Sequence, residues 1–448
     1  MAEYSVTDIA KKLKVSTRTI QREIRRGKLV ANRVGRKFLI SDVALERYFQ
    51  KDALELEEKV TKFCQSKKYD MVNLLQRLVA MPSEADIPES QENLAKFLKA
   101  TLENMGLRTV MYGEGESSTV HATFGYAKKG LLFDCPLDTV PVGDPDRWSY
   151  PPHDGLIKNG KMYGRGTADC KAGIVAMIYS VLALREYVDE HKVRVELVFD
   201  GGEQNGQYVG MQSTLDRGID VEAGIVGYAG NAHELAIGSR GYHRYKFRVK
   251  GKAAHTGSRT HYGINAITKA AALIRELDMI TFPKSKYDLF WFGSRITPAI
   301  IEGGNAINVV PDECVIDIDT RIPPDLSRKQ VDAKINEVIK KLKKQDPEFS
   351  VTMTYGAGNE GYVIKKTDKI IGTVLNAIQT TINIKPELIV NGQAHVGNLL
   401  AKYKIPVIVK GPVGGNVHSY DEYVAIDSLP QTSEIYAKTI VDYFELKK

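Results

Sequence analysis

The chain has 448 residues, of which 43% are hydrophobic and 26% are charged, as in an ordinary soluble globular protein of two to four domains. No apolar run is long enough to cross a bilayer and no charged-then-apolar leader stands at the start, so we expect no membrane contact and a cytoplasmic protein. The four cysteines lack CxxC spacing, which argues against a disulfide framework and against a thiolate zinc site.

The positive charge is concentrated in the first fifty residues. Residues 1–50 contain 12 Lys and Arg against 5 Asp and Glu, a net charge of +7, and the whole chain, with 62 against 55, also stands at +7. The other 398 residues therefore balance, with 50 charges of each sign. A basic segment of this kind indicates an anionic partner such as nucleic acid.

The same fifty residues predict two short helices in succession. Ser5 is placed to cap the first helix, and Ser16 to cap a second helix over residues 17–26. Ile20 and Ile24 fall on the buried face of this second helix. Its outward-facing basic and polar side chains are Arg18, Thr19, Arg22, Arg25 and Arg26.

A basic-tipped hairpin follows, and a third helix begins at residues 41–42. The segment 29–40 alternates in polarity around a glycine-containing turn with Arg36 and Lys37 at its tip. Two short helices, the second of them basic, followed by such a hairpin resemble the winged helix-turn-helix of the MerR and excisionase-like regulators. The resemblance implies that the hairpin tip contacts phosphates, and that Arg18 and Arg22 read base edges in the major groove. The alternatives are a solvated basic surface and a winged-helix module for protein contact.

The rest of the chain reads as a linker helix and a large α/β domain with an insert. Residues 51–67 form a charged amphipathic pattern typical of a linker helix. Strands and helices then alternate over residues 68–235 and 359–448, which predicts an α/β domain with a mainly parallel sheet. Residues 236–358 follow the order strand, helix, strand, strand, helix, which predicts a compact two-layer α+β insert.

A set of motifs extends through residues 68–448. It consists of Leu137–Pro141 with Trp148, Gly164–Lys171, Gly202–Gly206, Gly251–His255, Gly263–Ala266, Asn308–Pro311, Asp319–Arg321, Gly411–Pro412 and His418–Glu422. Together they resemble the acetylornithine deacetylase, succinyl-diaminopimelate desuccinylase and carboxypeptidase G family of dinuclear zinc amidohydrolases. The resemblance implies a zinc-exopeptidase-like α/β domain with an inserted lid through which two copies form a homodimer.

The metal site that this resemblance implies is only partly retained. The family's chemistry needs two zinc ions that share a carboxylate, and a Glu that acts as general base. Asp169 matches the shared carboxylate, His418 matches a further ligand, and Glu203 matches the general base. The remaining ligand positions hold side chains that bind zinc poorly or not at all. They are Pro136, Gln204 and Tyr228.

We therefore predict impaired catalysis and no required cofactor, with Asp169 and His418 hydrogen-bonded to each other in a metal-free pocket. The alternative is a deacylase or dipeptidase that holds one weakly bound zinc ion at Asp169, Gln204 and His418, with Glu203 as base.

The substrate-binding positions of the family are retained. The resemblance implies that Arg321 grips the substrate carboxylate and that His255, in the lid, reaches the partner's pocket to bind the scissile carbonyl oxygen. It also implies that Asn308, Gly414 and Gly415 line the same region. The alternatives are a structural salt bridge for Arg321 and a satisfied strand-end histidine for His255.

These patterns predict a ligand-responsive DNA-binding regulator. Its sensor would be a catalytically impaired amidohydrolase-like domain that binds a carboxylate-bearing amino acid, acyl-amino acid or dipeptide. The lid dimer would place two basic helices at two operator half-sites. The alternatives are the residual hydrolase and a DNA-anchored scaffold without a small ligand.

Overall fold

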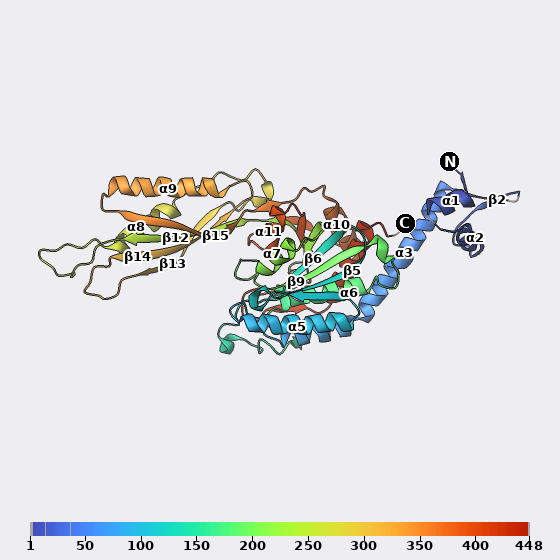
Figure 1. Ribbon diagram of the computed structural model, residues 1–448, viewed down its shortest axis with the longest axis horizontal. Helices are drawn as coiled ribbons and strands as arrows, with labels where there is room; N and C mark the ends of the chain where they lie inside the picture. The colour runs from blue at the N-terminus through green and yellow to red at the C-terminus, as the bar shows by residue number, and fades with distance from the viewer. Residues whose placement is uncertain (1–2, 14, 36, 447–448) are drawn as a thin grey trace.

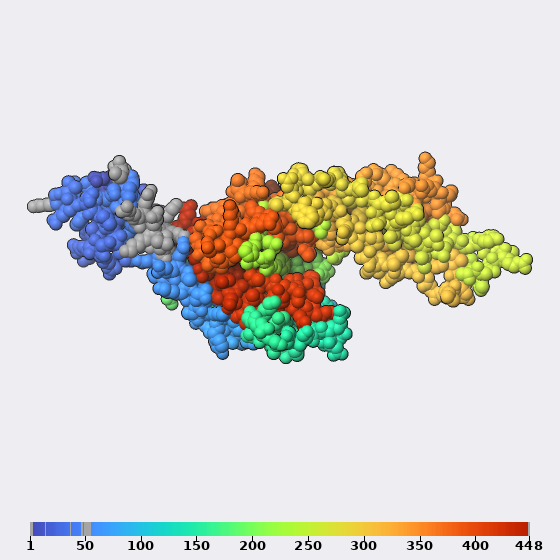
Figure 2. Space-filling view, turned by 180° about the vertical axis from the view of Figure 1, so that it is seen from behind, coloured from blue at the N-terminus to red at the C-terminus, as the bar shows by residue number. Residues whose placement is uncertain are grey.

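The computed structural model of the chain describes residues 3–13, 15–35 and 37–446, and for residues 46, 47 and 49–54 it describes the backbone alone. Three parts follow one another along the long axis: an N-terminal module, a central α/β body and an insert (Figures 1 and 2). None of the helices in these described ranges combines the length and the apolar character that a bilayer crossing needs.

The N-terminal module consists of two short helices and a three-stranded sheet. Ser5 and Ser16 cap the helices, each accepting a hydrogen bond from the backbone N–H three residues ahead. The expected hairpin forms, and its second strand also pairs with a short first strand that we did not predict. The elements are β1 (Glu3–Ser5), α1 (Val6–Lys12), α2 (Thr17–Arg25), β2 (Asn32–Val34) and β3 (Lys37–Ser41).

One continuous helix, α3 (Asp42–Ser66), joins the module to the body (Figure 1). The sequence analysis placed a third helix of the module and a separate linker helix in this segment, and the structure makes them one helix of 25 residues. Its second half packs against the last helix of the body, α12 (Ser428–Tyr443). The module is therefore carried on a helical arm.

The body is built on a nine-stranded sheet in the order β16-β11-β18-β10-β6-β9-β5-β4, with β17 paired to β11. The central strands β18, β10, β6 and β9 are parallel, whereas β4, β5, β11 and β16 are added antiparallel. The sheet is therefore mixed rather than mainly parallel, because short connections such as the one between β4 and β5 permit only antiparallel pairing. The strands are β4 (Arg108–Tyr112), β5 (Thr119–Gly125), β6 (Gly130–Pro136), β9 (Arg194–Asp200), β10 (Val221–Val226), β11 (Glu234–Ser239), β16 (Tyr362–Val363), β17 (Glu387–Asn391) and β18 (Val407–Val409).

Helices cover both faces of this sheet. One hydrophobic core joins α4, α5, α6, α10 and α12 to one face, and a second core joins α7 and α11 to the other. The central strand β6 is therefore buried along its whole length, as its apolar run predicts. The helices are α4 (Lys68–Val79), α5 (Pro88–Asn104), α6 (Ala172–Leu182), α7 (Val209–Asp216), α10 (Lys369–Ile382) and α11 (Val396–Lys402).

A small four-stranded sheet beside the carboxyl edge of the large sheet supports the site loops. Its order is β19-β20-β8-β7, which brings segments far apart in the chain together. The strands are β7 (Leu156–Lys158), β8 (Lys161–Tyr163), β19 (Gly414–Gly415) and β20 (Tyr423–Ala425).

The insert is an antiparallel four-stranded sheet in the order β13-β14-β12-β15, with two helices packed on one face (Figure 1). The sequence analysis omitted its fourth strand, β15, and placed residues 236–239 in the insert, where they belong to β11 of the large sheet. The elements are β12 (Gly241–Lys250), α8 (Ala266–Asp278), β13 (Arg295–Gly303), β14 (Glu313–Ile322), α9 (Arg328–Gln345) and β15 (Ser350–Asn359).

Candidate functional site

The carboxyl ends of the parallel strands β6, β9, β10 and β18 open onto one cavity, the edge where α/β sheets bind ligands. The cavity has a volume of about 640 Å³. Its wall combines loops of the body with the base of the insert. The residues that the sequence analysis assigned to the metal site and that line this cavity are Asp169, Glu203, Gln204, Tyr228 and His418.

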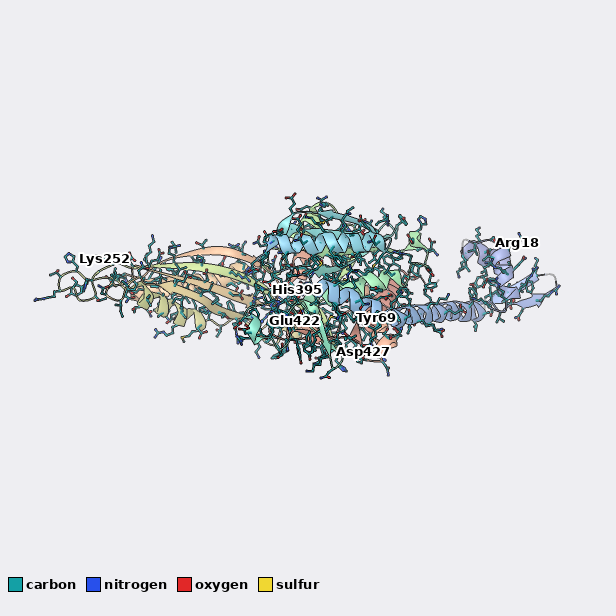
Figure 3. All side chains as sticks on the ribbon, turned by 90° about the horizontal axis from the view of Figure 1, so that it is seen from below. Arg18, Tyr69, Lys252, His395, Glu422 and Asp427 are labelled. Carbon is teal, nitrogen blue, oxygen red and sulfur yellow. The ribbon has the colours of Figure 1, made fainter. Side chains whose placement is uncertain are left out.

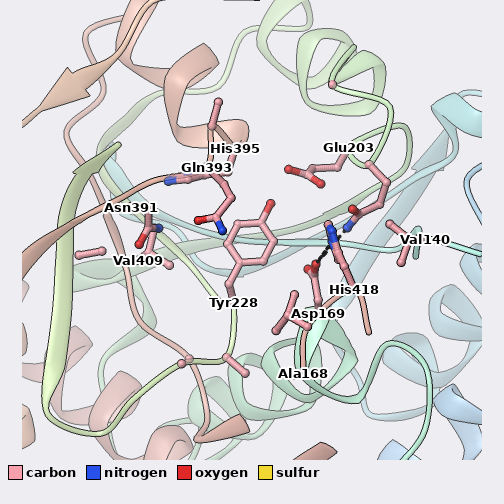
Figure 4. A pocket seen from close by; sticks show the side chains of 18 of the residues that line it. Val140, Ala168, Asp169, Glu203, Tyr228, Asn391, Gln393, His395, Val409 and His418 are labelled. Atoms are coloured by element: carbon pink, nitrogen blue, oxygen red, sulfur yellow. Dashed lines mark hydrogen bonds and ion pairs between the residues drawn. The ribbon is translucent and has the colours of Figure 1, made fainter. Parts of the chain in front are cut away.

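Asp169 and His418 form a hydrogen-bonded pair in the cavity (Figure 4). His418 Nε2 lies 2.8 Å from Asp169 Oδ2, and this hydrogen bond raises the pKa of His418. The backbone of Asp169 is held by Glu422, whose carboxylate accepts hydrogen bonds from the N–H of Ala168 at 2.8 Å and of Asp169 at 3.0 Å. Glu422 is itself paired with buried Arg165 at 2.7 Å. The orientation of Asp169 is therefore fixed from behind the cavity.

The three substituted ligand positions do not supply zinc ligands. Pro136 ends β6 and offers only its backbone carbonyl, which lies 3.5 Å from the Cys170 thiol. Gln204 turns its amide nitrogen toward Asp169 Oδ2 at 3.4 Å. Burial raises the pKa of the Tyr228 hydroxyl well above its usual value, so Tyr228 stays a neutral phenol.

Zinc ligands must be deprotonated or carry a free lone pair, so this donor set does not fit the zinc pair that the resemblance implies. Within the described ranges, no group of three or more His, Cys, Asp or Glu side chains is arranged to hold a metal ion.

Glu203 lies among other acidic groups. Asp138 accepts hydrogen bonds from the backbone N–H of Glu203 at 3.1 Å and of Gln204 at 2.8 Å, which fixes the turn after β9. Burial, followed by the charges of Asp169 and Asp138, raises the pKa of Glu203 well above its usual value. Glu203 therefore lies in a buried cluster of acidic groups, and the general-base role that the resemblance implies for it stays a prediction.

Two arginines from the insert form a cationic wall of the cavity. Arg321 places Nε 2.6 Å and Nη2 3.3 Å from the carboxylate of Asp319, and Arg244 Nε lies 3.4 Å from the same group. Tyr242 packs against both guanidinium groups. One carboxylate faces two cations, so the wall keeps positive charge for an anionic ligand. The sequence analysis missed Arg244 and Tyr242, although alternation along β12 places both on one face.

His255 and Asn308 lie far from this cavity, near the tip of the insert. His255 forms an isolated bridge with Val309, and the carbonyl oxygen of Asn308 accepts a hydrogen bond from the Thr256 N–H at 3.0 Å. Figure 3 labels the nearby Lys252 at this end of the molecule. Strands of ten residues, each spanning about 3.3 Å per residue, separate the tip from the cavity. Within one chain Asn308 therefore lies away from Arg321, and its place beside the ligand stays a prediction.

Gly414 and Gly415 lie behind the cavity wall. A side chain at Gly414 would meet Ala168 at 3.0 Å and Ala229 at 3.1 Å, both of which line the cavity. Gly414 therefore allows the β19 backbone to approach this wall closely.

The turn between β17 and α11 adds an uncharged wall made of Asn391, Gln393 and His395. His395 Nδ1 accepts a hydrogen bond from the Gly397 N–H at 3.1 Å, which places the ring proton on Nε2. Burial lowers the pKa of His395 to about 3, so the ring is neutral. We did not assign these residues a role from the sequence, where only a Gln-Ala-His run before an apolar helix marks them.

The second helix of the N-terminal module presents the expected basic face. Arg18, Arg22, Arg25 and Arg26 are exposed. Thr19 is half-buried, with its hydroxyl 2.9 Å from that of Ser16, so it contributes to the helix cap. Lys37 is exposed at the hairpin tip, and Arg36 lies outside the described residues.

Two family profiles match the chain. That of the peptidase family M20/M25/M40 matches residues 132–442, and that of a helix-turn-helix domain matches residues 3–53.

Solved structures with similar folds include three peptidases. The M20 family metallo-carboxypeptidase Sso-CP2 from Sulfolobus solfataricus is 17% identical, with a TM-score of 0.70 over 84% of this chain and 99% of that one. The aminopeptidase PepT from Bacillus cereus is 21% identical, with a TM-score of 0.68 over 84% and 98%. The di-peptidase Dug1p from Saccharomyces cerevisiae is 16% identical, with a TM-score of 0.69 over 87% and 98%.

Proposed function

Because the chain belongs to the peptidase family M20/M25/M40 and also carries a helix-turn-helix domain, we propose that it is a ligand-responsive DNA-binding regulator. Its peptidase-like domain binds a small carboxylate without hydrolysing it. DNA binding by the basic module responds to that ligand.

The observation that carries this proposal is the chemistry around Asp169 and His418. The three neighbouring ligand positions hold a proline, an amide that turns its nitrogen inward and a neutral phenol. Such a set does not hold the zinc pair that generates hydroxide near neutral pH. Arg321 and Arg244 nevertheless both line the cavity, which supports a role in binding an anionic group. A cavity that keeps its binding wall and loses its zinc ligands is suited to recognition.

The ligand class follows from the cavity. A guanidinium group can bind a carboxylate through two parallel hydrogen bonds, and Arg321 keeps donors beyond those that it gives to Asp319. A volume of about 640 Å³ accommodates an amino acid, an acyl-amino acid or a dipeptide.

A homodimer formed through the insert would give the protein two DNA-binding modules. The strand β13 is the edge of the insert sheet, and it exposes Ile300 and Ile301, while nearby Ile307 is fully exposed. An open apolar edge of this kind is suited to pairing with a second copy. Each of the two modules, carried on its helical arm, then binds one of two operator half-sites.

The test combines metal analysis with DNA footprinting on the full-length protein. The metal content of the purified protein is measured, and footprints upstream of its own gene are recorded at fixed salt with and without a panel of N-acetyl-L-amino acids and dipeptides. We expect less than one zinc ion per chain and a footprint that changes with one class of ligand. Two zinc ions per chain with dipeptide turnover, or the absence of any specific footprint, would overturn the proposal.

A second candidate is a hydrolase with one metal at Asp169, Gln204 and His418. It is favoured by one observation, namely that these residues and Glu203 line the same cavity. Zinc-dependent hydrolysis of a dipeptide that disappears in His418→Ala would establish it.

A further inference from the structure

The wall formed by Asn391, Gln393 and His395 is a second polar feature of the cavity, separate from the arginines and from the Asp169–His418 pair. Asn391 is the last residue of β17, and Gln393 and His395 belong to the turn that leads from it into α11. In Figure 4 this turn lies on one side of Tyr228, and Asp169 and His418 lie on the other. The wall therefore borders Tyr228 and lies apart from the Asp169–His418 pair.

His395 offers a hydrogen-bond donor that the protein leaves unused. The side chain is only 4% exposed, and its Nδ1 accepts from Gly397 at the start of α11. The proton therefore lies on Nε2, which has no hydrogen-bond partner among the described residues. Buried donors are paired in most folded proteins, so an unpaired one beside a cavity indicates a missing acceptor.

The two neighbouring side chains can both donate and accept. The half-buried Asn391 and the exposed Gln393 line the cavity, and neither carboxamide makes a hydrogen bond to a residue that the structure describes. The nearby Lys410 is not available as a donor, because its ammonium group already donates to the carbonyl oxygens of residues 231, 232 and 234. Glu234 is the acidic side chain on this part of the wall, and its charge faces that of Lys410.

We propose that this turn is an amide-binding subsite. The ligand's amide carbonyl accepts a hydrogen bond from His395 Nε2, and its N–H donates to the side-chain oxygen of Asn391 or Gln393. An amide is the group that needs one donor and one acceptor side by side and carries no charge. The ligand's carboxylate lies at Arg321.

This subsite rests on the proposed sensor function and narrows its ligand class. It selects an acylated amino acid or a peptide over a free amino acid. His395 Nε2 is shielded by its neighbours, which include the ring of Tyr228 at a centroid distance of 5.7 Å. The ring of Tyr362 lies at a similar centroid distance of 5.8 Å, so a ligand reaches Nε2 only when these neighbours shift.

The test uses binding calorimetry on the full-length protein with matched probes. The probes are N-acetyl-L-amino acids with acidic, apolar and basic side chains, each paired with its free amino acid. Two variants separate the roles of the histidine. His395→Asn keeps an oxygen near Nδ1 to accept from Gly397 and removes the Nε2 donor, whereas His395→Gln places an amide N–H near the Nε2 position.

We expect the natural protein to bind an N-acetyl probe at least tenfold more tightly than the matched free amino acid. His395→Asn loses this preference and His395→Gln keeps most of it, while Arg321→Ala weakens binding of both probes. An unchanged preference in His395→Asn, with binding still dependent on Arg321, overturns the subsite and leaves the sensor proposal standing. If no probe binds any form of the protein, the carboxylate-sensor proposal falls together with the subsite.

Discussion

The hydroxyl of Thr61, in the helix that carries the DNA-binding module, donates a hydrogen bond of 2.7 Å to the carboxylate of Glu434 in the last helix of the body. Glu434 is also paired with Lys438 at 2.8 Å, and both side chains are buried. The last helix, α12, packs in turn against α6, which starts directly after the loop of Asp169. The arm and the cavity are therefore connected through two packed helices.

The buried pair in α12 supports the attachment of the arm. Glu434→Ala leaves Lys438 without its carboxylate in a buried position, and we expect it to lower the free energy of unfolding by about 3–5 kcal/mol. Thr61→Val removes one hydrogen bond and keeps the ion pair, so its cost is about 1 kcal/mol. Urea unfolding of both variants measures the difference. Equal effects would contradict this role of the ion pair.

The basic helix α2 should set DNA affinity and sequence preference. Arg18→Ala and Arg22→Ala are each expected to cost about 1–3 kcal/mol on a specific site and to relax specificity there. Lys37→Ala at the hairpin should weaken binding evenly across sequences and reduce its salt dependence. Fluorescence anisotropy over a salt series distinguishes these outcomes, with Lys128→Ala on the body as control. A loss in the control equal to that of Arg22→Ala would contradict the assignment.

Arg321 and Arg244 should share the binding of the ligand carboxylate. Arg321→Ala is expected to lose about 1.5–3 kcal/mol of binding free energy because a charged hydrogen-bonding partner is removed. Arg244→Ala should lose less, because the Arg244 side chain is 49% exposed and that of Arg321 only 28%, so its interaction with a ligand is more strongly screened by solvent. Lys246→Ala, on the same face of β12 but outside the cavity lining, is the matched control. The measurement is the rise in melting temperature that the ligand causes in each of the three variants. A smaller rise in the Lys246→Ala control alone would contradict the role of the two arginines in binding the carboxylate.

His395 should make the fold sensitive to acid. Burial lowers its pKa to about 3, whereas in the unfolded chain it titrates near pH 6.5, so the unfolded state binds more protons between these values. The contribution of neutral His395 to the free energy of unfolding is therefore complete above about pH 6.5. It decreases as the pH falls below that value, by at most about 1.4 kcal/mol per pH unit. His395→Gln should remove that part of the slope. Urea unfolding at pH 7, 6 and 5 checks it, and parallel curves for both proteins would refute it.

The sequence by itself determined the features that depend on neighbouring residues. The caps at Ser5 and Ser16, the basic face of the second helix and the hairpin were all readable because capping and alternation act within a few positions. The peptidase-family assignment was readable from the motifs and is confirmed. The sequence also provides Pro136, Gln204 and Tyr228, from which impaired zinc binding stays a prediction.

Only the tertiary structure decided which distant residues meet. It placed Arg244 with Arg321 through the register of β12 and β14, and it placed Asn308 at the far end of the same sheet. It also brought His395 against Tyr228, 167 positions away in the chain, and left its Nε2 without a partner. Local periodicity carries no information on such contacts, because sheet order and core packing set them together.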